Sequence, residues 1–162
     1  MEFRYFQGRL TRIRDLPAEY PGTAGCYKMM TVVNSEGSIV NFVVTPDTYF
    51  VDHETLKVGY QVIGFYDANA PVPLIYPPQY EVLVMARVTR GRNVEVAFFD
   101  SRLVSSDGWL KLNIGPSTRI LLENDQAFNR NLANRNLVVT FGPTTRSIPA
   151  QTTPYEIIVL CL

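Results

Sequence analysis

Six arginines form two short runs whose spacing suits the binding of an anion. Arg12 and Arg14 are two residues apart, and Arg90 and Arg92 repeat that spacing. Because side chains alternate along a strand, each pair lies on one face if its segment is extended. Paired guanidinium groups bind phosphate or carboxylate. The candidate anion patch comprises Arg9, Arg12, Arg14, Arg87, Arg90 and Arg92.

An ordinary role for the same arginines stays open. Acidic residues stand close to them in the sequence, and exposed ion pairs mainly keep strand ends soluble while adding little stability. The acidic residues that would pair with them are Asp15, Glu19, Glu95 and Asp100. The sequence therefore leaves two readings of the cluster, a binding patch and a set of solvated or paired charges.

Two proline-rich segments, 67–79 and 142–154, supply a second candidate site, a loop face of tyrosines and polar side chains. Prolines fix φ and favour an ordered course for the chain. Tyrosines held in this way serve as stacking platforms for bases or sugars, as packing residues, or as anchors in a protein contact. The apolar Val72, Leu74 and Ile75 should pack against either the barrel or a partner, and of the two we expect internal packing. The candidate loop-face residues are Tyr66, Asp67, Asn69, Tyr76, Tyr80 and Arg146.

No set of residues with the spacing of a catalytic or metal site is present. His53 is the one histidine, and its neighbours Asp52 and Glu54 would point in different directions from a loop. A structural zinc site needs four Cys or His ligands, and a serine hydrolase needs a nucleophile motif that this chain lacks. We nominate no catalytic residue, metal ligand or cofactor. Cys26 and Cys161 are expected as buried or half-buried thiols, with a bridge between them left open.

The composition is that of a folded, soluble β protein. Of 162 residues, 46% are hydrophobic and 19% charged, which predicts a buried core. The nine Tyr and nine Phe favour strands. Fifteen basic and fifteen acidic residues cancel, which argues against a dedicated nucleic-acid binder. The absence of a signal peptide or a long apolar run predicts a cytoplasmic protein that does not enter a membrane.

The segment 80–92 organises the predicted fold. Its first half resembles segment 155–159 and its second half resembles segment 8–14, so the two halves of the chain have the pattern of an internal duplication. Each half reads as a long strand, a hairpin, a short helical crossover, a fourth strand, a long loop and a fifth strand. That order is the order of an oligonucleotide/oligosaccharide-binding (OB) barrel.

We therefore expect an all-β protein built from two tandem OB-like, five-stranded barrel units. Their predicted extents are 1–85 and 80–162, and the shared central strand 80–92 would fuse them into one rigid body. A single large β-sandwich with the same strands is the alternative. Within the second unit, the spacing of apolar residues over 124–134 predicts a short helix.

The chain also resembles an uncharacterised family of small clostridial (Firmicutes) proteins. The resemblance is carried by segments 65–71, 75–80, 106–115 and 144–149, which include Ile75-Tyr76-Pro77-Pro78 and Asp107-Gly108-Trp109. It covers most of the chain. It implies tandem OB-like units and no particular activity.

Three functions are compatible with the sequence. The first is a non-enzymatic interaction module that binds a protein partner or assembles with itself. The second is an OB-type binder of single-stranded nucleic acid or another polyanion, which would use the arginines. The third and most remote is a hydrolase built around Asp52, His53 and Glu54.

Overall fold

The protein is all-β in its computed structural model, with 48% of residues in strands and 4% in helical turns. The structure describes all 162 residues. The chain divides into two compact units, unit 1 (Met1–Val88) and unit 2 (Thr89–Leu162). Neither of its short helical turns has the length that a membrane-spanning helix needs.

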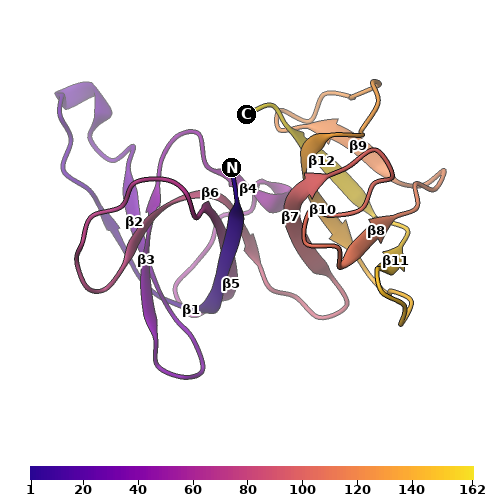
Figure 1. Ribbon diagram of the computed structural model, residues 1–162. Helices are drawn as coiled ribbons and strands as arrows, with labels where there is room; N and C mark the ends of the chain where they lie inside the picture. The colour runs from indigo at the N-terminus through magenta and orange to yellow at the C-terminus, as the bar shows by residue number, and fades with distance from the viewer. The chain divides into compact units, whose positions relative to one another are not determined.

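Unit 1 is a sheet that closes on itself (Figure 1). β1 pairs with β2 and β5, β2 with β3, and β5 with β6, all antiparallel, and a parallel pairing of β3 with β6 completes the ring. β4 lies parallel to β6 further along the same edge. The strands are β1 (Phe3–Asp15), β2 (Lys28–Val33), β3 (Ile39–Val44), β4 (Tyr49–Phe50), β5 (Gln61–Asp67) and β6 (Gln79–Arg87), and the 3-10 turns are η1 (Pro21–Thr23) and η2 (Val51–His53).

β1 is long because it serves two neighbours in succession. Its first half pairs with β5 and its second half with β2, and the two pairings overlap at Arg9. A Cβ atom at residue 8 would stand 2.4 Å from the carbonyl oxygen of Val33, so only glycine permits this close approach of the hairpin to β1. A register shift between Leu10 and Arg12 then resets the alternation of side chains.

Alternating apolar residues of the ring fill the core of unit 1. Leu10, Val32, Phe42 and Val62 are fully excluded from solvent. Burial of apolar area on this scale is the main stabilising term in folding. The core residues are Leu10, Met30, Val32, Val40, Phe42, Val44, Leu56, Val62, Val82 and Met85.

Unit 2 repeats several of these pairings (Figure 1). β10 pairs antiparallel with β7 and β12, as β5 does with β1 and β6, and β12 runs parallel to β9 as β6 does to β4. β8 pairs parallel with β11. The strands are β7 (Asn93–Phe99), β8 (Leu110–Leu112), β9 (Arg119–Leu122), β10 (Arg135–Phe141), β11 (Ala150–Thr152) and β12 (Glu156–Leu160). Its core consists of Ala97, Phe99, Leu110, Leu112, Leu132, Leu137, Val139, Ile157 and Val159.

The predicted shared strand over 80–92 is not formed. β6 ends at Arg87 and pairs only with strands of unit 1, whereas β7 begins at Asn93 and pairs only with β10. Between them, Thr89 and Arg92 form an isolated bridge around Gly91, which has φ +78°. A glycine in the left-handed region reverses the chain at low cost and ends the strand. Segment 80–92 therefore consists of most of β6 and the turn that precedes β7, and not of one continuous strand.

The predicted helix over 124–134 is also wrong. The segment returns along β9, because Leu122 N–H donates to the Gln126 carbonyl and Phe128 N–H donates to the Ile120 carbonyl. The side chain of Asn124 accepts from the Gln126 N–H, a local bond that competes with a helix. Asp125 has φ +66°, which no helix contains. The apolar residues thus pack against a strand and not along a helical face.

Candidate functional site

Three of the predicted arginines lie on the exposed outer face of β1. Arg9, Arg12 and Arg14 alternate with Leu10 and Ile13, which face the core, and the register shift keeps all three arginines on the outside. None of them forms a salt bridge; Arg14 Nη2 lies 3.1 Å from the sulfur of Met29. The nearest predicted acidic partner, Asp15, pairs with Lys28 Nζ at 2.6 Å. Unit 1 thus presents three guanidinium groups with no carboxylate opposite them.

The other three arginines have different surroundings. Arg87, at the end of β6, places Nη1 3.4 Å from Glu54 Oε2 and its guanidinium 3.7 Å from the centre of the Tyr60 ring. This geometry is a structural ion pair and a cation–π contact. Arg90 and Arg92 belong to unit 2, where Arg90 is exposed and Arg92 is half-buried. The six predicted residues therefore divide between the two units.

Tyr66 and Tyr80 are half-buried and lie against each other. Their rings stack with centroids 3.9 Å apart, and both pack on the core of unit 1. Burial raises the pKa of the Tyr66 hydroxyl, and the neighbouring Tyr80 raises it further. These two loop-face candidates therefore occupy each other's stacking surfaces, so their observed role is structural.

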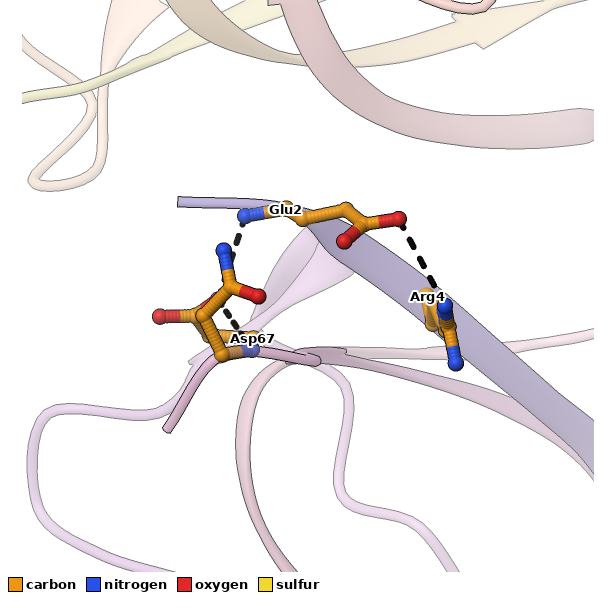
Figure 2. A network of polar contacts seen from close by, with 4 residues as sticks. Glu2, Arg4 and Asp67 are labelled. Atoms are coloured by element: carbon orange, nitrogen blue, oxygen red, sulfur yellow. Dashed lines mark hydrogen bonds and ion pairs between the residues drawn. The ribbon is translucent and has the colours of Figure 1, made fainter. Parts of the chain in front are cut away.

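Asp67 fixes the chain terminus and the start of the β5–β6 loop (Figure 2). Its Oδ1 accepts hydrogen bonds from the N–H groups of Asn69 at 3.0 Å and Glu2 at 3.1 Å. Both bonds lower the pKa of the Asp67 carboxyl, and the bond from Asn69 has the larger effect. Arg4 lies 3.6 Å from the Glu2 carboxylate. Asp67 is occupied with backbone donors, while the side chain of Asn69 stays exposed.

The β5–β6 loop, residues 68–78, exposes its apolar side chains. Leu74 is 100% exposed, Tyr76 is 79% exposed, and Ile75 and Val72 are more than two-fifths exposed. The prediction that Val72, Leu74 and Ile75 pack internally is therefore wrong. None of these apolar side chains belongs to the core of unit 1. Tyr76 is the one predicted tyrosine that is free to stack on a ligand.

The corresponding loop of unit 2 presents Arg146 to solvent. Thr145 N–H donates to the Gln151 carbonyl and Gln151 N–H donates to Thr145 Oγ1, both at 2.9 Å, which ties the base of the loop. Ile148 is 77% exposed beside it. The loop is therefore ordered by its own hydrogen bonds and leaves one cation and one apolar side chain available.

A groove that the sequence did not predict runs beside β1 in unit 1. Two adjoining hollows of about 340 and 520 Å³ share Asn34, Ser35 and Gln61 in their walls. Only the pairing of β1 with β5, and the position of the β2–β3 hairpin, bring these distant residues together. The remaining wall residues are Tyr5, Phe6, Gln7, Gly8, Arg9, Thr11 and Val33.

Glu95 on β7 is a second feature that the sequence did not single out as unusual. Burial raises the pKa of its carboxyl to about 7, and the negative charge of Asp107 contributes. Its Oε1 accepts the N–H of Val96 at 3.1 Å. An alternating strand pattern does not reveal this burial, because Glu95 occupies an ordinary polar position in the sequence.

The cysteines and the histidine do not gather into a site. Cys26 and Cys161 are both free and exposed, which corrects the expectation of buried or half-buried thiols. The His53 ring packs edge-on against Tyr49, with centroids 5.5 Å apart. No three metal-ligating side chains come together in the structure.

Comparison of the chain with family models, with curated proteins and with solved structures gave no match. The geometry of the site residues therefore carries the functional argument.

Proposed function

We propose that this protein is a non-enzymatic binding module and that unit 1 contacts another protein through its β5–β6 loop. The observation that carries the proposal is the exposure of Leu74 and Tyr76 at the loop, with Ile75 between them half exposed. An ordered, contiguous group of apolar side chains in water is typical of a protein-contact surface. Tyrosine in such a group is a common anchor of binding energy.

The experiment is site-specific photo-cross-linking in the cells that make the protein. A benzoyl-phenylalanine side chain replaces Leu74 or, as a matched control, Val58, which is 57% exposed in the same unit. We expect discrete cross-linked protein products from position 74 and none from position 58. A product at twice the protein's own mass identifies self-assembly. Absence of products from position 74 contradicts the proposal.

The binding unit that we propose is an OB barrel, and its duplication in unit 2 is part of the proposal. In support, the strands of unit 1 form a closed five-stranded ring with the long first strand shared between two neighbours. The parallel and antiparallel pairings that recur in unit 2 support descent from one ancestral unit. Membership of the clostridial family stays a prediction from the sequence.

A second candidate function is the binding of single-stranded nucleic acid or another polyanion to β1. It is favoured by the position of Arg9, Arg12 and Arg14 on one exposed face without carboxylate partners. Guanidinium groups in this state lose no ion pair when a phosphate approaches. The net neutrality of the whole chain weakens long-range attraction but leaves such a local site intact.

A salt titration with labelled oligothymidylate tests the second candidate. The logarithm of the affinity should fall linearly with the logarithm of the salt concentration, with a slope of about −0.7 for each phosphate contacted. For the double variant with Arg12→Gln and Arg14→Gln, this slope should be less steep by about two such increments. Arg130→Gln, which removes an exposed arginine of unit 2, should leave the slope unchanged. No binding at low salt excludes this function.

A further inference from the structure

The peptide groups of β1 point alternately to its two neighbours, and the hydrogen bonds fix which residues face which way. Leu10 N–H donates to the Tyr60 carbonyl, and the Glu2 carbonyl accepts from Ala68 N–H. Both bonds point toward the β5 side. Because direction alternates along a strand, the even-numbered residues of β1 face β5, and Tyr5 and Gln7 face the opposite side.

That opposite side is open beside Tyr5 and Gln7. β2 occupies it only from Arg9 onward, because β2 ends at Val33, the partner of Arg9. By this alternation the backbone N–H and C=O groups of Tyr5 and Gln7 point away from β5, and no turn or loop residue hydrogen-bonds to them. A short strand edge with free donors and acceptors is a template for an added strand.

The groove described above lies along this open edge. Residues 5–8 form one of its walls, and Asn34 and Ser35 of the β2–β3 hairpin form its end. Tyr5 is 62% exposed and offers an apolar surface to a neighbouring strand. The groove therefore combines free main-chain groups with a side-chain surface, which are the two parts of strand-addition recognition.

Charge determines which peptide suits the groove. Arg9 stands at its closed end, is exposed and forms no salt bridge, and no acidic residue lines either hollow. In an added strand, the residue paired with Gln7 places its side chain on the same face as Arg9 and diagonal to it. The long side chain of Arg9 reaches that position. An Asp or Glu at that position would form an ion pair with Arg9, whereas a Lys would be repelled.

We infer that the open edge of β1 binds an extended acidic peptide, which adds as a strand beside Tyr5 and Gln7 with a carboxylate near Arg9. This site goes beyond the loop contact proposed above, since it uses other residues and main-chain hydrogen bonds. It requires neither OB ancestry nor the exposed apolar loop to be functional.

The experiment selects binders from a displayed library of random decapeptides against the full chain. We expect binders with alternating β-branched residues and at least one Asp or Glu, and protection of the Tyr5 and Gln7 amides from hydrogen exchange when they bind. Gln7→Pro removes the backbone N–H donor of residue 7 at the open edge. Loss of one hydrogen bond worth about 1.4 kcal/mol should weaken peptide binding about tenfold. Gln7→Thr keeps that N–H and should bind as the wild type does.

If Gln7→Pro unfolds the protein, two further variants test the same edge of β1. Arg9→Glu should reverse the preference, so that Lys-containing versions of the same peptides bind more tightly. Leu74→Gln should bind the peptides unchanged, which separates this site from the loop. Failure to find any binder that protects the Tyr5 and Gln7 amides overturns the inference. So does protection of those amides by dimerisation without peptide, because the edge would then belong to a second copy.

Discussion

The ring of Tyr66, at the end of β5, lies flat on the ring of Tyr80, at the start of β6, with planes 9° from parallel. The long loop between the two strands starts and ends at this stack. Phe42 contacts Tyr66 from the core side at 6.3 Å between centroids. The pair therefore fixes the base of a loop whose outer residues are exposed.

Tyr80→Leu should destabilise unit 1 by about 1 kcal/mol, the additional value of an aromatic pair beyond the apolar area that leucine retains. Urea unfolding measures the change. Tyr76→Leu is the control, because Tyr76 is exposed and its loss should change stability by less than about 0.5 kcal/mol. Equal effects from the two substitutions would show that the stack contributes nothing.

Asp67→Ala should cost about 1 kcal/mol, because the N–H groups of Glu2 and Asn69 lose their shared acceptor. Amide exchange at these two residues should accelerate. The pKa of Asp67 is lowered by folding, so its contribution is complete above the ordinary value of 3.8 and is lost as the pH falls through the lower folded pKa. Unfolding curves between about pH 5 and pH 2 should therefore be less pH-dependent in the variant. If the stability of the variant depends on pH as steeply as that of the wild type, Asp67 does not have this role.

Glu95 should make the protein less stable as the pH rises from its ordinary pKa of 4.5 through about 7. Over this range the folded state binds more protons than the unfolded state, so each step in pH favours unfolding. The loss should be on the order of 2–3 kcal/mol. Thermal unfolding of Glu95→Gln should lack this dependence and show higher stability near pH 8. Glu36→Gln, at an exposed position, is the control and should retain the dependence of the wild type.

Gly64→Ala should destabilise unit 1 by about 1–3 kcal/mol through overpacking. A Cβ atom there would lie 2.6 Å from two carbons of the Phe42 ring, and Phe42 is fully buried. Gly22→Ala is the matched control, since a Cβ atom at residue 22 meets nothing within 4 Å. Chemical denaturation measures the free energy of unfolding of both variants. If Gly64→Ala leaves it unchanged, the Phe42 ring can move aside.

Local pattern predicted most of the strands. The sequence pattern predicted a long first strand followed by a hairpin, and the structure has both. β1 spans Phe3–Asp15, and the turn between β2 and β3 contains Gly37 at φ +83°, a conformation that favours glycine. The predicted helix over 124–134 failed because apolar spacing alone does not distinguish a helical face from a segment that returns along a strand. The sequence pattern did not predict β4, because a strand of two residues is too short to show alternation.

The candidate sites were predicted less well than the strands. Residue type indicated tyrosines and arginines, but Tyr66 and Tyr80 cover each other, and Arg87 pairs with Glu54. Residue type also failed to indicate the groove at the β1 edge, whose walls include Gln7 and Gln61, because their proximity depends on strand register.

The sequence by itself determined the all-β character, the long first strand and the hairpin turns, since each depends on the preferences of neighbouring residues. Tertiary structure decided the closure of unit 1, where Asn41 pairs with Gln79, and the separation of β6 from β7. It also decided which backbone groups point to an open strand edge, among them those of Tyr5 and Gln7. The physical reason is that pairing, burial and charge compensation depend on residues brought together from distant parts of the chain.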